Sequence, residues 1–430
     1  MLTAPGPGPV LRWSARADSI AGVESELARI WARQDLAVEM DGQPARHVSA
    51  RTSVMNLVVI ARTQEIAARG AATIQALTGK HPSRTIVVQS ADPDGPSWID
   101  ARVEAHCILP REDAPETCAE TIHMTVGGEA GRHLSAIVTP LIIHDLPVAV
   151  WWPGEPPFLS RPARDLLTGA DRLIVDGSTW GGDGLARLRE MATLQDLATL
   201  AISDFALVRQ SRWREAIASI FDDPAFLPYL RSLRRVAVTY ATHDETGALG
   251  TANLVKPVYH VAWLASQLAL DVRAPLRVMD RGHRPVANPV RRHGSGTIQR
   301  PALGGGLAAT LADGRSEVSV VIRPVVSPMP AGTTLRVELL AERRGSELRA
   351  DVTAEAETVH VRVWQDGVEC LDRAFLAARR RDVDLLAEVI ETGALDHVAI
   401  GTLRKAAELI TEVASKSGSE AVPAAPAGRV

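Results

Sequence analysis

The sequence predicts an α/β protein in which a mostly parallel, doubly wound sheet is followed by an antiparallel β-rich region and C-terminal helices. Up to about residue 275, short apolar runs alternate with segments of helical period, which is typical of parallel strands joined by crossover helices. Between residues 335 and 363, apolar and polar residues alternate, which indicates antiparallel strands with one solvated face. Two segments of helical period then end the fold.

A chain of 430 residues is too long for one compact core, so more than one folded part is expected. Changes in composition and period divide the chain into six predicted parts. They are a disordered tail (1–18), an α/β domain (19–280), a basic, glycine-rich connector (281–306), an antiparallel β region (307–380), C-terminal helices (381–416) and a second disordered tail (417–430).

The first strand–helix–strand unit follows a helix that is predicted around residues 23–30. Residues 54–60 are an apolar run broken only by Asn56, and they are predicted to form a buried strand. Thr63 is suited to cap the next helix, and residues 85–88 are predicted to form the second strand. The unit spans about thirty residues, which is the size expected of a βαβ crossover.

The later elements of the α/β domain follow from the same patterns. Half-exposed strands are predicted at residues 98–109 and 120–126, and a helix with a kink at Pro140 is predicted over residues 134–142. Further buried strands are predicted at residues 148–152, 172–175, 236–240 and 276–279, with helices between them.

The β-rich region has a polar face that carries six residues: Arg336, Glu338, Arg349, Asp351, His360 and Arg362. The turn at residues 343–346 is predicted to join two of its strands as a hairpin. The first of the two C-terminal helices is predicted to stop at a glycine, residue 393, in the position that favours a left-handed conformation.

Charge and hydropathy argue against two classes of partner. The formal net charge is −4 and the isoelectric point about 6.3, so the chain lacks the basic excess that sequence-independent nucleic-acid binding requires. The N-terminus lacks the layout of a signal peptide, and the most apolar stretch, residues 134–152, is interrupted by Pro140, Asp145 and Pro147. We therefore expect a cytoplasmic protein that binds neither nucleic acid nor membrane.

The three cysteines are odd in number and include no CxxC pair, which argues against a disulfide framework or a zinc knuckle and favours a reducing compartment. Cys107 and Cys118 lie near two predicted neighbouring strands, so a redox-switched pair remains as an alternative. His106 is adjacent to Cys107 and would face the other side of a strand. With His123 and His133 also considered, no metal site is expected.

The sequence lacks the common cofactor and catalytic motifs. The turn at residues 60–65 of the first strand–helix–strand unit has no glycine, so a dinucleotide pyrophosphate could not approach its backbone closely. Lys80 is followed by His81 instead of Ser or Thr, and no GxSxG, HExxH or EF-hand pattern occurs. We therefore expect a protein that is not an enzyme and that holds no cofactor.

An aromatic segment at the end of a predicted strand is the first candidate for partner binding. Trp151 and Trp152 are followed by Pro153 and, two residues later, by Glu155. Aromatic residues are enriched at interface hot spots, so these four residues are candidates for a rigid partner-binding surface. The alternative interpretation is that the tryptophans close the core and the proline ends the strand.

The connector supplies three more partner-binding candidates, Arg284, Arg291 and Arg292. This local basic cluster could meet an acidic partner or a phosphosugar. A solvated loop explains the same composition.

Four polar residues near the ends of predicted elements are candidates for binding a sugar phosphate. Asp176 and Ser178 directly follow a strand, Arg84 precedes one, and Arg132 lies where a helix begins. Each also has a plainer interpretation, because Asp and Ser form local turns and caps, and Arg84 and Arg132 occupy an ordinary turn and helix start.

Five of these segments, taken in order, resemble the glucose-6-phosphate dehydrogenase assembly protein family (OpcA). They are RTSVMNL (51–57), HPSR (81–84), LPVAVWWPG (146–154), DRLIVDGS (171–178) and WR (213–214). The resemblance covers roughly residues 45–300 and is weaker in the β-rich region. The tryptophan–proline and Asp-Gly-Ser segments are specific when they occur together.

The resemblance implies a protein that binds glucose-6-phosphate dehydrogenase, the first enzyme of the oxidative pentose phosphate pathway, and that helps it assemble or activates it allosterically. It implies no catalytic residues, because the family has none established. The competing hypothesis is a sugar-phosphate-binding sensor or enzyme that uses the strand-end loops of the α/β sheet.

Overall fold

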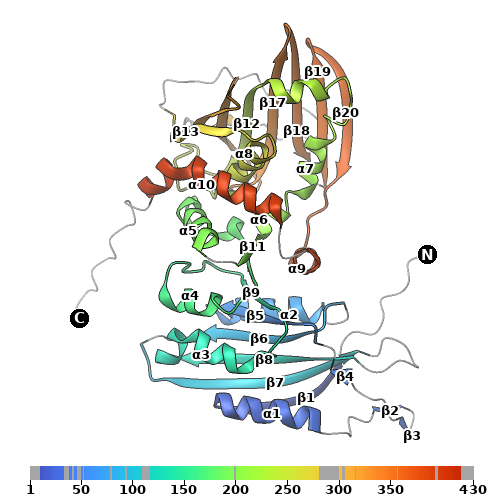
Figure 1. The fold of residues 1–430 in the computed structure, drawn as a ribbon, viewed down its shortest axis with the longest axis vertical. Helices are drawn as coiled ribbons and strands as arrows, with labels where there is room; N and C mark the ends of the chain where they lie inside the picture. The colour runs from blue at the N-terminus through green and yellow to red at the C-terminus, as the bar shows by residue number, and fades with distance from the viewer. Residues whose placement is uncertain are drawn as a thin grey trace. The chain divides into compact units, whose positions relative to one another are not determined.

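The computed structural model of the chain is an α/β protein with two large sheets (Figure 1). It describes residues 10–32, 38–40, 43–45, 50–51, 53–77, 80–92, 94–108, 117–197, 200–279, 300–302, 306–314, 316–355, 357–392 and 396–417.

The chain divides into two compact units that interleave in sequence. The first consists of Met1–Asp176, Leu197–Ser203 and Arg381–Ala394, and the second of Gly177–Asp196, Asp204–Arg380 and Leu395–Val430. Residues 19–280, which the sequence presents as one α/β domain, therefore contribute to both units.

The first unit contains a mostly parallel sheet with the strand order β1-β7-β8-β6-β5-β9-β10-β11, in which β4 also pairs with β8. Its strands are β1 (Val10–Ala17), β4 (Ala50–Arg51), β5 (Met55–Ala61), β6 (Ser83–Ser90), β7 (Trp98–Ile108), β8 (Thr117–Gly127), β9 (Val148–Trp152), β10 (Arg172–Val175) and β11 (Ala201–Asp204). Strands β8, β6, β5, β9 and β10 run parallel, whereas β7 is antiparallel to both β1 and β8. A separate two-stranded sheet pairs β2 (Val38–Met40) with β3 (Gln43–Ala45).

The predicted strand–helix–strand unit is confirmed by β5, α2 (Gln64–Gln75) and β6, because β5 and β6 pair in parallel. The hydroxyl of Thr63 accepts a hydrogen bond from the Ile66 amide at 3.3 Å and caps α2 as predicted. The side chain of Asn56, the one polar residue of β5, is fully buried. Its amide group donates to the Ile143 carbonyl at 3.0 Å and its oxygen accepts from the Ile143 amide at 2.7 Å, which ties the start of β5 to the loop before β9.

The other helical segments of the first unit are α1 (Ile20–Ala32), η1 (Gly128–Arg132), α3 (Leu134–Val138), η2 (Thr139–Leu141), α4 (Arg161–Leu167) and α9 (Asp382–Glu391). The predicted kinked helix is α3 followed by the 3-10 turn η2, in which Pro140 lies. Segments α2 and η2 cover opposite faces of the sheet. Gln75 of α2 contacts His106 on β7. The Leu141 carbonyl of η2 accepts from Arg84, whose ion-pair partner Glu120 lies opposite Ala105 of β7. Because Ala105 and His106 are adjacent in the strand, they point to opposite faces of the sheet.

Three strands of the first sheet, β1, β4 and β11, were not predicted. Residues 10–17 lie within the predicted disordered tail, but they form β1 and pair with β7. Their alternating polar side chains suit an edge strand, whose stability comes from its neighbour and not from an apolar run of its own. Strand β11 reads AISD and lacks the apolar run by which the equally short β10 was predicted.

The second unit contains a mostly antiparallel sheet with the order β13-β15-β16-β12-β17-β18-β19-β20, in which β14 also pairs with β16. Its strands are β12 (Leu233–Thr242), β13 (Asp271–Val278), β14 (Arg300–Pro301), β15 (Leu307–Ala312), β16 (Glu317–Val326), β17 (Thr334–Arg343), β18 (Ser346–Glu355), β19 (Thr358–Gln365) and β20 (Val368–Leu376). Among the described pairings of this sheet, only β12 with β16 is parallel.

The prediction that the parallel sheet extends to about residue 275 is wrong. The strands predicted at residues 236–240 and 276–279 correspond to β12 and β13, which belong to the antiparallel sheet. They were placed with the parallel strands because α8 (Val255–Gln267) separates them, as a crossover helix would. Their actual neighbours, β15, β16 and β17, come later in the chain, and a local pattern does not reveal them.

The predicted hairpin at residues 343–346 is confirmed by the pairing of β17 with β18. Its two central residues, Arg344 and Gly345, have φ angles of 52° and 82°, which is the left-handed geometry that a two-residue hairpin turn requires.

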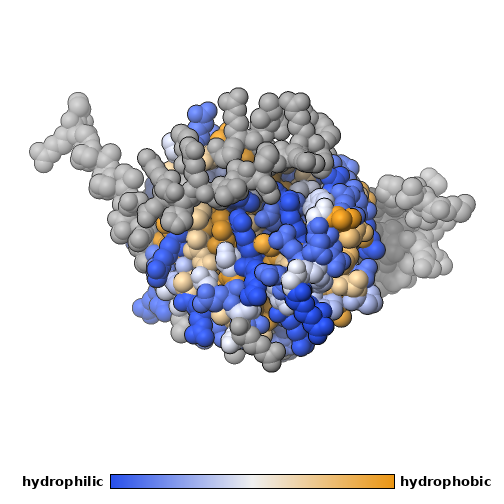
Figure 2. All heavy atoms as spheres, turned by 90° about the horizontal axis from the view of Figure 1, so that it is seen from above, coloured by the Kyte–Doolittle hydropathy of each residue, from blue (hydrophilic) through white to orange (hydrophobic). Residues whose placement is uncertain are grey.

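The remaining helical segments of the second unit are η3 (Gly177–Thr179), α5 (Leu185–Leu197), α6 (Phe205–Val208), α7 (Ser211–Ala218), η4 (Leu227–Ser232), α8 and α10 (His397–Ser417). The two predicted C-terminal helices are α9 and α10, and they fall in different units. The predicted stop at residue 393 lies outside the described residues. On the face seen in Figure 2, hydrophilic residues surround smaller hydrophobic areas.

Cys107 and Cys118 form a disulfide, which differs from the expectation of reduced cysteines. The two residues lie directly opposite each other on β7 and β8, with Cα atoms 4.1 Å apart, and both are buried. The odd count arises because Cys370 is free and exposed. Among the described residues, no helix is both long enough and apolar enough to cross a membrane.

Candidate functional site

The two tryptophans of the aromatic segment are buried. Trp151 is 1% and Trp152 is 4% exposed, and both belong to β9, which lies between β5 and β10 in the first sheet. Pro153 is also buried, and Glu155 is half-buried. The segment therefore does not form the exposed aromatic surface that was expected, and the alternative interpretation, in which the pair closes the core, describes the structure better. The large apolar area of a tryptophan ring makes burial favourable wherever a sheet offers room.

The Asp-Gly-Ser segment is a tightly held turn. Asp176 is buried at the end of the first unit, and residues 177–179 form the 3-10 segment η3 of the second unit. The Gly177 amide donates to Asp204 Oδ1 at 2.8 Å, and the Asn253 side-chain amide donates to the Gly177 carbonyl at 2.9 Å. The Arg209 guanidinium donates to Ser178 Oγ at 3.1 Å. Hydrogen bonds within the second unit thus hold Gly177 and Ser178 in this turn.

Asp204 is the centre of that turn, although no pattern in the sequence singled it out. It is 4% exposed, caps α6 by accepting from the Ala206 amide at 2.8 Å, and accepts from the Tyr259 hydroxyl at 2.8 Å. Burial and the neighbouring Asp204 carboxylate both raise the pKa of Tyr259 well above its usual value. A Cβ atom on Gly177 would lie 2.6 Å from Asp204 Oδ2, which explains the glycine.

Arg84 is part of the core of the first sheet. Its Nε donates to Glu120 at 2.5 Å, its Nη1 donates to the Leu141 carbonyl at 2.9 Å, and Glu120 is fully buried. Because both charges of this pair are withdrawn from water, the partners depend on each other. Arg84 is therefore engaged within the fold and is not presented to an external anion.

Arg132 lies at the surface in η1, where it forms ion pairs with Asp94 at 3.0 Å and Glu129 at 3.5 Å. Arg84 is near the amino end of β6, whereas Arg132 follows the carboxyl end of the parallel strand β8. Strands rise about 3.3 Å per residue, so roughly six residues of strand separate the two side chains. The structure does not bring these two arginines together on one ligand.

Three charged or titratable side chains meet on the opposite face of β7 and β8. Glu104 Oε2 lies 2.9 Å from His106 Nε2 and 3.5 Å from His123 Nε2. Burial lowers the pKa of His123, although the Glu104 carboxylate opposes this effect. Among the described residues, no group of three or more His, Cys, Asp or Glu side chains is placed to hold a metal ion.

The connector candidates Arg284, Arg291 and Arg292 lie outside the described residues.

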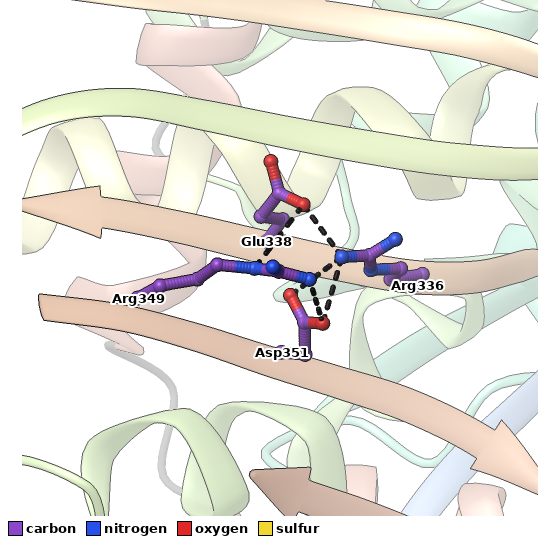
Figure 3. A network of polar contacts seen from close by, with 4 residues as sticks. All are labelled: Arg336, Glu338, Arg349 and Asp351. Carbon is purple, nitrogen blue, oxygen red and sulfur yellow. Dashed lines mark hydrogen bonds and ion pairs between the residues drawn. The ribbon is translucent and has the colours of Figure 1, made fainter. Parts of the chain in front are cut away.

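A polar network on the second sheet joins residues that the sequence placed only on a solvated face. Arg336 Nη2 lies 2.5 Å from Glu338 Oε2 and 2.7 Å from Asp351 Oδ2. Arg349 Nη2 lies 2.8 Å from Asp351 Oδ2. In Figure 3 the two guanidinium groups approach the two carboxylates from opposite directions along strands β17 and β18. The alternation identified the face, but the register between strands was needed to bring these four side chains together.

Residues 74–193 match a family model described as the glucose-6-phosphate dehydrogenase subunit N-terminal domain. The matched stretch extends from the end of α2 into α5. It therefore includes most of the first sheet and the tryptophan–proline and Asp-Gly-Ser segments.

Two curated relatives carry the name OxPP cycle protein OpcA. The protein from Synechocystis is 23% identical over 202 residues, or 46% of this chain and 40% of the relative. That from Synechococcus elongatus is 26% identical over 201 residues, or 46% of this chain and 42% of the relative. The match thus spans about two fifths of the length of each curated relative.

Solved structures show only loose similarity. An NAD binding oxidoreductase from Klebsiella pneumoniae is 10% identical, with 85% of this chain and 98% of that chain covered and a TM-score of 0.43. The transcriptional regulator Gal80p from Kluyveromyces lactis is 10% identical, with 86% and 94% covered and a TM-score of 0.44. The sequence matches, by contrast, confirm the resemblance of this chain to the glucose-6-phosphate dehydrogenase assembly protein family, OpcA.

Proposed function

We propose that this protein is a non-catalytic, cytoplasmic assembly factor or allosteric activator that binds glucose-6-phosphate dehydrogenase and favours its active oligomer. In that role it supports the oxidative pentose phosphate pathway. The observation that carries the proposal is the match of residues 74–193 to the dehydrogenase subunit domain of the family.

The geometry of the first strand–helix–strand unit supports a role without a dinucleotide cofactor. The turn from β5 to α2 has no glycine, and the Thr63 side chain occupies the helix N-terminus as its cap. Glu65 adds a negative charge to the first turn of α2, where a bound pyrophosphate would be repelled.

Three of the four residues considered for sugar-phosphate binding give that alternative little support. Arg84 is engaged with Glu120, Arg132 lies beyond the other end of the strands, and Ser178 takes part in a local turn. A binding role towards another protein requires no such convergence of polar groups.

The proposed mechanism is a shift of population. If this protein binds the active oligomeric state of the dehydrogenase more tightly than its other states, the difference in affinity favours that state. A tenfold preference corresponds to about 1.4 kcal/mol, which is enough to change the populations of two states of similar stability.

The experiment that tests the proposal measures the activity of the same organism's glucose-6-phosphate dehydrogenase at limiting substrate, with increasing amounts of this protein. We expect a saturable rise in rate and a complex on a sizing column. The matched control is the same titration with heat-unfolded protein. Neither a complex nor a change in rate, under oxidising and under reducing conditions, would contradict the proposal.

A further inference from the structure

The polar face of the second sheet carries a cluster of four arginines and two acids, here called the arginine cluster. It consists of Arg235 on β12, Arg323 on β16, Arg336 and Glu338 on β17, and Arg349 and Asp351 on β18. Register brings these residues together, because Thr239 of β12 lies opposite both Arg323 and Arg336, and Glu338 lies opposite Asp351. All six side chains are half-buried.

The cluster lies on the side of the sheet away from the described helices. Its residues alternate with Val337, Leu339 and Val352, which are at most 2% exposed. Helices α7 and α8 contact these strands. Because the apolar residues are buried, they lie on the face that the helices cover, and the arginines that alternate with them lie on the other face. Figure 1 shows α7 and α8 lying against the sheet within the second unit.

The cluster holds more positive than negative charge. Its four guanidinium groups face two carboxylates, and both carboxylates are already occupied by Arg336 and Arg349. Within the described part of the chain, Arg235 and Arg323 form no ion pair, and the buried Nε atoms of Arg235, Arg336 and Arg349 donate to no acceptor. Guanidinium donors therefore exceed carboxylate acceptors here.

Electrostatics agree with this excess. Burial lowers the pKa of Arg323, and although Glu338 and Asp351 counteract it, Arg235 and Arg336 lower it further. Half-burying unpaired charges of one sign is costly, and an external carboxylate would relieve that cost by forming charge-assisted hydrogen bonds.

We infer that the arginine cluster is a docking surface for an acidic segment of a protein partner, whose carboxylates pair with Arg235 and Arg323. The inference rests on the proposed function, in which that partner is glucose-6-phosphate dehydrogenase. It adds the surface that is used and the charge of the segment that is bound.

Charge and shape select this occupant over two others. A second copy of this chain would place the same positive cluster against itself if the two met through a two-fold axis, and like charges repel. A small anion is held best by a concave site, whereas strands present a broad face. Trp364 on β19 extends the same surface, with the Arg349 guanidinium 5.0 Å from its ring centroid, and Trp and Arg are frequent hot-spot residues.

The test measures the affinity of the full chain for the dehydrogenase by surface plasmon resonance. Arg323→Glu should raise the dissociation constant by about tenfold or more, because it replaces an attraction with a repulsion, whereas Arg323→Lys should stay within about threefold of the wild type. The matched control is Arg273→Glu, which makes the same change in charge at an exposed arginine on β13 of the same sheet. If Arg323→Glu does not fold, Arg323→Gln and Arg235→Gln, each checked by circular dichroism, take its place.

The outcomes separate this inference from the proposed function. Weaker binding by the Arg323 variant, with normal binding by Arg273→Glu, would support the docking surface. If the wild type binds and the folded Arg235 and Arg323 variants bind equally well, the docking surface is wrong and the proposed function stands. If the wild type does not bind the dehydrogenase, both are overturned.

Discussion

At the scale of single residues, His260 is a buried titratable group of the second unit. It lies on α8 with 1% of its surface exposed, and neither ring nitrogen has a hydrogen-bond partner among the described residues. Its ring lies 5.2 Å from that of Trp213, centroid to centroid. Burial, followed by the nearby positive charges of Arg214 and Lys256, lowers its pKa to about 3.

We predict that His260 makes the protein less stable in mild acid. The folded state keeps this histidine neutral, whereas the unfolded chain binds a proton near pH 6.5, so the unfolded state gains protons as the pH falls. The contribution of His260 is therefore fully present above about pH 6.5 and is lost progressively between pH 6.5 and 3. His260→Phe keeps an aromatic ring beside Trp213 and removes this effect.

The measurement is the free energy of unfolding in urea at pH 7.5, 6 and 5. Below pH 6.5, the unfolding free energy of the wild type should fall more steeply than that of His260→Phe. The difference should be about 1.4 kcal/mol for each pH unit. The matched control is the same substitution at the exposed His144. Parallel pH profiles for wild type and His260→Phe would show that the imidazole is not kept neutral by the fold.

At the scale of elements, the Cys107–Cys118 bond joins the centre of the first sheet to its antiparallel edge, since β8 pairs with β6 on one side and β7 on the other. The bond spans a sequence separation of 11 residues. Constraining a loop of this length removes chain entropy from the unfolded state and stabilises the fold by about 3 kcal/mol.

We therefore expect Cys107→Ala/Cys118→Ala to lower the unfolding free energy by about 3 kcal/mol in the oxidised protein. In the presence of dithiothreitol the difference from wild type should shrink, because the wild type then loses the same constraint. Thermal unfolding followed by circular dichroism, with and without the reductant, measures both quantities. Cys370→Ala, at an exposed free cysteine, is the control and should have no effect. Reductant-independent stability of the wild type would contradict the prediction.

The positions of single helices and strands were predicted better than the pairing of strands in the sheets. The positions of β5, α2 and β6 follow from a local apolar period and a cap at Thr63, and these are properties of neighbouring residues. The assignment of β12 to a sheet depends instead on β16 and β17, which lie some eighty or more residues later in the chain. No local period carries that information, so β12 was placed with the wrong sheet.

The exposed aromatic surface was predicted wrongly for a related reason. Trp151 was selected for its residue type, but whether a tryptophan is exposed or buried depends on how neighbouring elements pack, and β9 proved to be an internal strand. The arginine cluster shows the converse. Each of its residues is unremarkable in sequence, and only the register of four strands brings them together.

At the scale of the whole molecule, charge is distributed unevenly. The chain carries a formal net charge of −4, yet the arginine cluster has a local excess of positive charge. Whether an acidic partner is affected by the net negative charge or by the positive arginine cluster depends on how far charges act through the solvent. The Debye length is about 30 Å at 0.01 M salt and about 10 Å at 0.1 M, so the net charge acts at low salt and the local cluster at physiological salt.

This separation predicts an unusual dependence of dehydrogenase binding on salt. Raising the salt from 0.01 to 0.1 M should leave the association rate unchanged or increase it, because screening removes the repulsion due to the net negative charge. From 0.1 to 0.5 M the rate should fall by up to about tenfold, as the attraction between the arginine cluster and carboxylates is screened in turn. In Arg323→Glu the fall at high salt should be much smaller, while Arg273→Glu should behave as the wild type.

Stopped-flow or plasmon-resonance association rates at these concentrations provide the measurement. A rate that declines steadily from the lowest salt, equally in all three proteins, would mean that the association is steered by charges elsewhere on the molecule.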